Sequence, residues 1–139
     1  MILNELPSQT ILLGAIAIGA GLVYLPYLVV AYARFQVGYD TAAPRALFDK
    51  LPGYGQRATW AHQNAWEAFA IFTTAALMAY VTGQGSDQAR WAAIAWVPAR
   101  LIFALAYIFN SPPLRALMFG VGSVCSFTLM ALSVTSSLK

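Results

Sequence analysis

Most polar side chains that could do chemistry lie in one short stretch, RATWAHQNAWEAF, residues 57–69. On an ideal helix of 3.6 residues per turn, the side chains of four residues fall within about 80° of one another: Arg57, Trp60, Asn64 and Glu67. They form one polar stripe on a helix whose continuation, AIFTTAALMAYV, is uncharged. His62 falls on the opposite side of this helix, so we interpret it as a structural or interface residue rather than a catalytic one.

A second polar set lies on the next apolar helix. Arg100 and Tyr107 are seven positions apart, so they share one face of it. If the two helices run antiparallel, Glu67 lies nine positions in from Ala58 and Arg100 nine positions in from Phe109, both counted from the same end. At about 1.5 Å per residue, both side chains are about 13 Å deep. Because either charge alone is costly in hydrocarbon, we expect Glu67 and Arg100 to pair.

Cationic and phenolic side chains in this region outnumber its one carboxylate. Arg57, Tyr107 and Arg115 converge on the same half of the helices and give more donors than Glu67 can satisfy. The carboxylate and its arginine partner could serve only as polar glue that locks the helices together, and this alternative stays open. The surplus of donors favours a small anionic ligand held beside a hydrophobic one, with Arg57 among the residues that bind it.

The composition identifies a membrane protein. The chain has 139 residues, of which 60% are hydrophobic and only 9% charged, unlike a soluble domain. The net charge of +3 comes from scattered arginines and not from a basic block, so no nucleic-acid partner is expected. The single cysteine, Cys125, and the single histidine leave neither a disulfide framework nor a metal site.

Four apolar stretches are long enough to cross about 30 Å of hydrocarbon as helices. They predict spans at residues 11–33, 58–81, 91–109 and 114–134. The short connections TGQGSDQA and NSPP require neighbouring helices to run antiparallel. The predicted fold is an all-α integral membrane protein, an antiparallel four-helix transmembrane bundle that forms one domain over residues 1–139. The second and third spans carry the polar residues, so their hydropathy should be the lowest.

The distribution of Lys and Arg predicts the orientation in the membrane. The long loop after the first span and the last turn together hold five of these residues, against two on the opposite side. The five are Arg34, Arg45, Lys50, Arg57 and Arg115, and the two are Arg90 and Lys139. We therefore expect the long loop and the last turn in the cytoplasm, with both termini on the other side.

Two further expectations concern the ends of the spans. The N-terminus, MILNELPSQT, lacks the positively charged region of a secretory signal, so the first span should be an uncleaved helix. Tyr80, Trp91 and Trp96 lie at or near predicted span ends, and we interpret them as anchors at the membrane interface.

Several motifs together resemble the MAPEG family, the membrane-associated proteins of eicosanoid and glutathione metabolism. They are RATWAHQNAWEAFAIF at the start of the second span, GYDTAAPRA in the long loop, and ARLIFALAYIFNSPPLR across the third span and last turn. The resemblance covers nearly the whole chain. It implies a homotrimer of four-helix subunits, with glutathione bound between adjacent subunits near the cytoplasmic half of the membrane.

The resemblance also implies roles for single residues. Asn64 and Glu67 look like the amide and carboxylate that bind glutathione, the carboxylate at its amino group. Tyr107 looks like the tyrosine that contacts glutathione from the third helix, and Arg100 like the buried arginine of that helix. Arg115 looks like the arginine proposed to stabilise the thiolate. A thiol with a pKa of about 8.5 is mostly protonated at neutral pH, and a nearby guanidinium favours the reactive anion.

The expected function is a membrane-embedded glutathione transferase or peroxidase, with glutathione as co-substrate and a small hydrophobic electrophile or lipid hydroperoxide arriving through the membrane lipid. Two other functions stay open. Trp60 stands where relatives carry a further arginine, which favours a non-catalytic lipid-binding or partner-binding protein of the same fold. A small transporter or channel subunit would also keep ionisable residues in the membrane. The tyrosine and arginine at positions 107 and 115 favour the enzyme.

Overall fold

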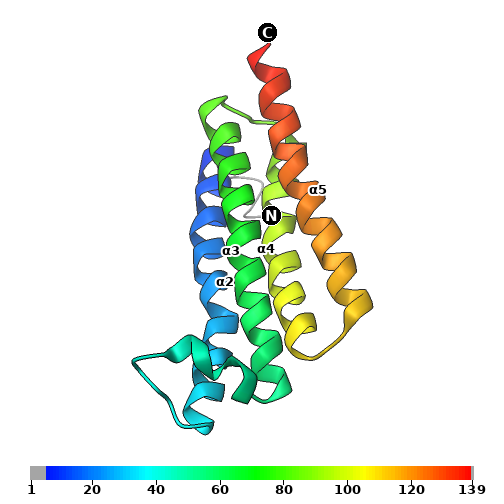
Figure 1. Ribbon diagram of the computed structural model, residues 1–139. Helices are drawn as coiled ribbons and strands as arrows, with labels where there is room; N and C mark the ends of the chain where they lie inside the picture. Colours follow the sequence, from blue (N-terminus) through cyan, green and yellow to red (C-terminus); the bar gives the residue numbers. More distant parts are fainter. Residues whose placement is uncertain (1–5, 139) are drawn as a thin grey trace.

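The computed structural model describes residues 6–138, and in that range the chain is helical with no strand. Four long helices follow one another as antiparallel neighbours (Figure 1): α2 (Ser8–Gln36), α3 (Gly53–Val81), α4 (Asp87–Ile108) and α5 (Pro112–Ser137). A short 3-10 helix, η1 (Pro44–Lys50), lies in the long connection between α2 and α3. The predicted all-α fold is confirmed. Lys139, which entered the orientation argument, and residues 1–5 of the N-terminal segment lie outside the described residues.

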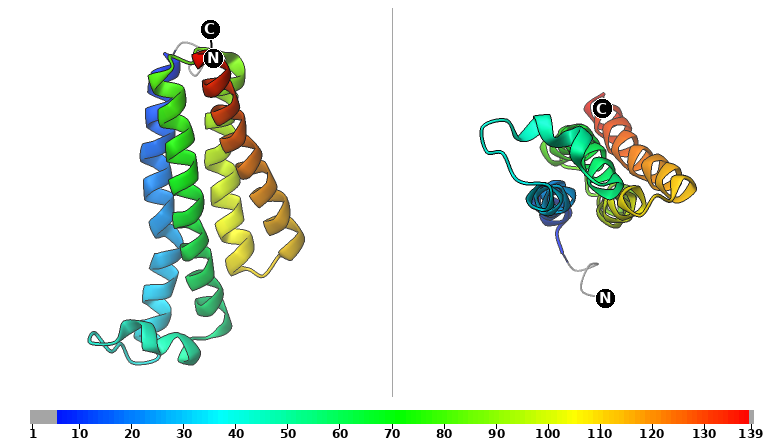
Figure 2. Two further views of the ribbon diagram at one scale, coloured as in Figure 1. Left: turned by 45° about the horizontal axis from the view of Figure 1, so that its top comes forward. Right: turned by 60° about the horizontal axis from the view of Figure 1, so that its bottom comes forward.

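The two central helices, α3 and α4, each pack against both α2 and α5. α5 crosses the others at an angle, with its first turns standing away from α3 and its last turns closer to it (Figure 1 and Figure 2). The connection that carries η1 and the turn between α4 and α5 lie at the same end of the molecule. We call this end the loop end. Because α5 is tilted, it is separated from α3 at the loop end. The polar residues of α3 and α4 lie in this half of the molecule.

The turn between α4 and α5 follows from three residues. Asn110 has a φ of 59°, a left-handed conformation that asparagine tolerates, and it ends α4. Ser111 donates its backbone N–H to the Ala106 carbonyl, which satisfies one of the last carbonyls of α4. Pro112 begins α5, where a backbone N–H is not needed. The turn thereby brings the first turn of α5, with Arg115, next to the last turn of α4.

The long helices extend beyond the apolar spans predicted from the sequence. α4 begins at Asp87 rather than at residue 91, because the Ser86 side chain accepts the Ala89 N–H and caps the helix. α3 begins at Gly53, directly after Pro52, rather than at residue 58. The predicted limits followed the hydrophobic residues, whereas the backbone hydrogen bonds of a helix continue into polar sequence.

By length and hydropathy, three of the described helices could cross a membrane: α2, α4 and α5. The polar residues of α3 keep it outside these limits, although it has the same 29 residues as α2. α4 has the lowest hydropathy of the three, as expected for the spans that carry polar residues. The chain is thus a membrane protein by its apolar helices, while the crossing of α3, which would give four spans, remains a prediction.

Trp96 is a core residue, and the prediction that it anchors the membrane interface was wrong. It is only 2% exposed and stacks on Phe72, with ring centroids 3.9 Å apart. The backbone of α2 comes close to this pair, since a Cβ on Gly19 would lie 2.9 Å from the Trp96 ring. Because α4 begins at Asp87, Trp96 lies near the middle of the helix rather than near its end.

Candidate functional site

A cavity of about 410 Å³ lies between α3, α4 and α5, and we call it the interhelical cavity. Three of the predicted site residues line it: Asn64 and Glu67 from α3 and Arg100 from α4. The rest of its wall is mainly apolar and aromatic, with Trp96 and Phe119 among the side chains. A mainly apolar wall with a few convergent polar groups is the usual form of a small-molecule site.

Arg100 is the buried cation of the site. Its side chain is 6% exposed, and its Nη2 donates to Asn64 Oδ1 at 2.7 Å and to the Asn64 backbone carbonyl at 3.5 Å. The guanidinium also lies over the Phe103 ring, 4.1 Å from its centroid, in a cation–π contact. Each of these partners is neutral, so they bind the guanidinium without cancelling its charge.

The pairing of Arg100 with Glu67 that the sequence predicted is not found. Both hydrogen bonds of Arg100 within residues 6–138 go to Asn64, and Glu67 lies on the same cavity wall with its side chain exposed. Asn64 and Glu67 are three positions apart, so they share a face of α3 and differ in level by about one turn. The prediction placed Arg100 at the level of Glu67, whereas the helices pack with Arg100 at the level of Asn64.

Gly122 of α5 makes room for Arg100, which the sequence did not reveal. A Cβ added at Gly122 would lie 3.3 Å from Arg100 Cδ, closer than a side chain normally tolerates. Ser123 and Ser126 line the cavity beside it, and each donates its hydroxyl proton to a backbone carbonyl one turn earlier. Their oxygens therefore remain available as acceptors. A small residue and two serines on one face of α5 are the only sequence signal of this wall.

A second hollow of about 460 Å³, wide open to the outside of the chain, adjoins the cavity, and we call it the open hollow. It is lined by Tyr107, Trp60 and Gln63 together with the same Asn64 and Glu67. These two side chains therefore form the boundary between an open, polar space and a more enclosed, apolar one. A ligand with a charged part and a reactant without charge could meet there.

Tyr107 and Arg115 are brought together by the turn between α4 and α5. The Arg115 guanidinium lies over the Tyr107 ring, 4.4 Å from its centroid. Tyr107 lines the open hollow, so Arg115 contacts the site through this ring. The structure thus brings Tyr107 into one constellation with Asn64 and Glu67, and places Arg115 at its edge.

Arg57 lies apart from both spaces. Its Nε donates to the carbonyl of Ile108 at 2.9 Å, and Ile108 is the last residue of α4. A carbonyl at a helix C-terminus has no partner within the helix and carries partial negative charge, so a guanidinium is a favourable partner there. In the single chain Arg57 joins the start of α3 to the end of α4.

His62 joins α3 to α2. Its Nδ1 bonds the Val23 carbonyl of α2 at 2.8 Å, and because a carbonyl only accepts, Nδ1 must carry the proton. Pro26 has no N–H to bond the Leu22 carbonyl, so the hydrogen-bond pattern of α2 is interrupted one residue before Val23. The histidine therefore ties α3 to α2 on the side of α3 away from Glu67.

These features define a class of protein: an all-helical membrane protein with an arginine, an amide and a carboxylate gathered among apolar helices. The sequence then gives the family. The profile of the MAPEG family matches residues 11–135 of the 139-residue chain, and the chain belongs to this family. No curated protein and no solved structure matches the chain significantly. MAPEG proteins act in membrane-bound glutathione and eicosanoid metabolism, and members commonly use glutathione.

Proposed function

We propose that this chain is a membrane-embedded glutathione transferase or peroxidase that acts on hydrophobic electrophiles or lipid hydroperoxides. The observation that carries the proposal is that Asn64 and Glu67 line both the open hollow and the interhelical cavity. A small peptide with charged ends fits the polar, open side, and a hydrophobic reactant fits the apolar side. Membership of the MAPEG family supports glutathione as the peptide.

In this proposal α3 and α4 supply the groups that bind glutathione. Glu67 pairs with its ammonium group, and Tyr107 contacts it from α4. Asn64 accepts from Arg100 through Oδ1, which leaves its NH₂ group to donate to a carbonyl or carboxylate of the ligand. Arg100 is a positioning residue, because it fixes the orientation of that amide. Arg57 adds a cation at the loop end.

Arg115 is the proposed catalytic residue. A guanidinium near the sulfur favours the thiolate, which is the reactive form of the thiol. With an electrophile, the thiolate forms the new sulfur–carbon bond while the leaving group departs with the bonding electrons. With a hydroperoxide, sulfur attacks the O–O bond and an alcohol leaves after protonation, and a second glutathione converts the sulfenic acid to the disulfide and water. Holding both reactants in adjoining spaces supplies part of the rate gain.

We further propose a homotrimer in which all four long helices cross the membrane, with the loop end on the cytoplasmic side. Glu67 lies at the middle of α3, 14 residues after Gly53 and 14 before Val81. Its side chain is exposed in the single chain. If α3 crosses the membrane, a carboxylate at the middle of the helix that faces hydrocarbon is costly. A second copy placed over the open hollow, with glutathione between the two, would cover it.

A non-catalytic lipid-binding or partner-binding protein of the same fold is the second candidate, and one observation favours it. Trp60 is 43% exposed, lines the open hollow and packs on Phe48 of η1 with ring centroids 5.6 Å apart. An indole at this position gives the hollow an apolar wall where a cation would hold a carboxylate. Such a wall suits an acyl chain better than a charged peptide.

The experiment that separates the two functions follows the ultraviolet absorbance of the thiolate after detergent-purified protein is mixed with glutathione in a stopped-flow instrument. Wild type is compared with Arg115→Ala and with Lys50→Ala, which removes an exposed charge of η1 outside both spaces. We expect a signal that saturates with glutathione in wild type and in the Lys50 variant, and that is lost in the Arg115 variant. Absence of any signal at millimolar glutathione in all three proteins would reject the enzyme and leave the lipid-binding function.

A further inference from the structure

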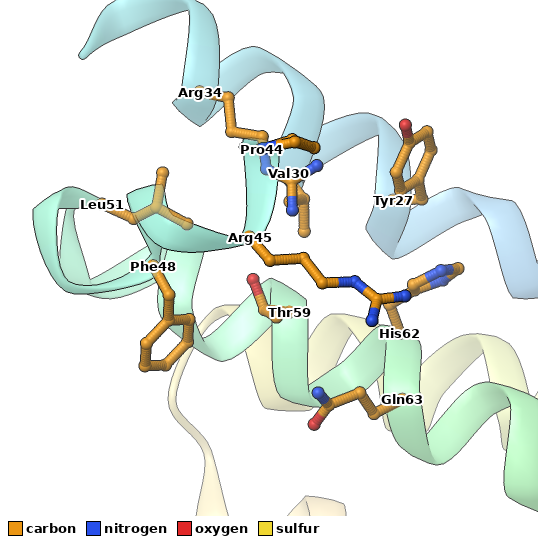
Figure 3. A pocket seen from close by; sticks show the side chains of 10 residues that line it. All are labelled: Tyr27, Val30, Arg34, Pro44, Arg45, Phe48, Leu51, Thr59, His62 and Gln63. Carbon is orange, nitrogen blue, oxygen red and sulfur yellow. The ribbon is translucent and has the colours of Figure 1, made fainter. Parts of the chain in front are cut away.

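A pocket of about 540 Å³ lies between α2, η1 and α3, and it shares no lining residue with the interhelical cavity. Figure 3 shows Arg34 entering it from α2, and Arg45 extending from η1 toward His62 of α3. We call it the arginine pocket. Of its lining residues only Gln63 also lines the open hollow, so the two spaces lie on neighbouring faces of α3 and meet at this residue.

The described charged side chains that line the arginine pocket are all positive. Its described lining includes two arginines and no Asp or Glu. The Nε of Arg34 is buried and has no hydrogen-bond partner within residues 6–138. A buried donor without a partner costs free energy comparable to a lost hydrogen bond. The pocket is thus lined by two guanidinium groups, with no carboxylate in its described lining to pair with them.

The α2 wall of the arginine pocket beyond Arg34 is apolar and aromatic, whereas α3 contributes Thr59, His62 and Gln63. Tyr27, Val30 and Arg34 lie on one face of α2, because they are spaced three and four positions apart. Tyr27 and Val30 continue the pocket along α2 for about two turns away from Arg34. A ligand that fills this pocket needs an anionic group at one end and an apolar part at the other.

The depth of the pocket matches the boundary between lipid headgroups and hydrocarbon. α2 has 29 residues and is about 43 Å long at about 1.5 Å per residue. The hydrocarbon layer is only about 30 Å thick, so the last turns of α2 reach the headgroups. Arg34 lies in the last turn of α2, and Arg45 lies in the connection beyond it. Tyr27 and Val30 lie deeper, at the level of acyl chains.

We propose that the arginine pocket binds the phosphate of an anionic phospholipid, with Arg34 and Arg45 on the phosphate and the start of an acyl chain along Tyr27 and Val30. The planar forks of two arginines match phosphate oxygens better than they match a zwitterionic or neutral group. The apolar wall favours a lipid phosphate over free phosphate. The proposal does not depend on the thiol chemistry, because it uses residues of α2 and η1 that line neither the open hollow nor the interhelical cavity.

The test measures binding of dioctanoyl-phosphatidylglycerol, below its micelle concentration, to the detergent-purified full chain by isothermal titration calorimetry. Inorganic phosphate and dioctanoylglycerol are the two matched probes, since each has one half of the lipid. Arg45→Gln is the main variant, because this side chain is exposed and its loss should not unfold the chain. Lys50→Gln, on the same short helix but outside the pocket, is its control.

We expect saturable binding of the phospholipid to wild type, much weaker binding of either half, and a loss of about tenfold in affinity in Arg45→Gln only. Equal affinity of Arg45→Gln and wild type would overturn the proposal, as would an equal loss in Lys50→Gln. Inorganic phosphate that binds as tightly as the lipid would make free phosphate the ligand. The thiolate signal with glutathione should be unchanged in Arg45→Gln. If it disappears together with lipid binding, the pocket belongs to the thiol site and the proposal fails.

Discussion

The buried Arg100 of α4 bonds the side chain of Asn64, at 2.7 Å, and not the carboxylate of Glu67 one turn further along α3. Because Arg100 bonds only one of them, Asn64 and Glu67 have different roles. Asn64 holds a charge that is already part of the chain, while Glu67 remains exposed at the boundary of two spaces and is available to a ligand or to a second copy of the chain.

Substitution of Asn64 should affect stability first. Asn64→Ala leaves the 6% exposed guanidinium of Arg100 without its side-chain acceptor, which should cost about 2–3 kcal/mol of unfolding free energy. Asn64→Asp keeps an acceptor in place and adds a charge partner, so it should be as stable as wild type. Thermal unfolding in detergent, followed by circular dichroism, measures both. If the alanine variant unfolds at the wild-type temperature, Arg100 has another partner and the assignment is wrong.

Substitution of Glu67 should show the opposite pattern. Glu67→Gln removes an exposed charge that has no hydrogen bond to Arg100, so the unfolding temperature should not fall. Glutathione affinity should fall by about tenfold or more, because the carboxylate is the proposed partner of the ammonium group. The concentration dependence of the thiolate signal gives the affinity. A drop in stability equal to that of Asn64→Ala, with affinity unchanged, would show that Glu67 supports Arg100 instead.

Two glycines of α5 provide a matched pair for the support of Arg100. In Gly122→Ala the new Cβ would lie 3.3 Å from Arg100 Cδ, so the side chain must shift by a few tenths of an ångström, at a cost of about 1 kcal/mol. In Gly120→Ala the new Cβ meets nothing within 4 Å, and the better helix propensity of alanine should stabilise by about 0.5–1 kcal/mol. The difference in unfolding temperature between the two variants measures the cost of displacing Arg100. Equal temperatures would mean that Arg100 moves without cost.

Much of this arrangement was predictable because helical periodicity determines which residues share a face. The apolar runs predicted the four long helices, and the spacing of Asn64 and Glu67 predicted that both lie on one wall of α3. The opposite position of His62 followed from the same periodicity, and there its ring bonds the Val23 carbonyl of α2. The motifs across the chain gave the family, which the match over residues 11–135 confirms.

What was missed depends on how the helices are placed relative to one another. The level at which α4 packs on α3 decides whether Arg100 meets Asn64 or Glu67, and one turn of shift lies within the uncertainty of any boundary drawn from hydropathy. Gly122 and the serines beside it lie on an apolar helix with no polar stripe to mark a site. The arginine pocket depends on how the loop carrying Arg45 folds back on α2, which no periodicity describes.

Arg57 combines a structural contact with a predicted ligand contact, and two substitutions separate them. Arg57→Ala removes the bond to the Ile108 carbonyl and should lower stability by about 1 kcal/mol. It also removes a cation from the loop end, so glutathione affinity should fall. Arg57→Lys keeps the charge but not the guanidinium that carries the bond, so it should lose stability while largely retaining affinity. Unfolding temperature and the thiolate titration are measured on both variants. If the alanine variant loses stability alone, Arg57 only joins α3 to α4, and its predicted contact with glutathione is wrong.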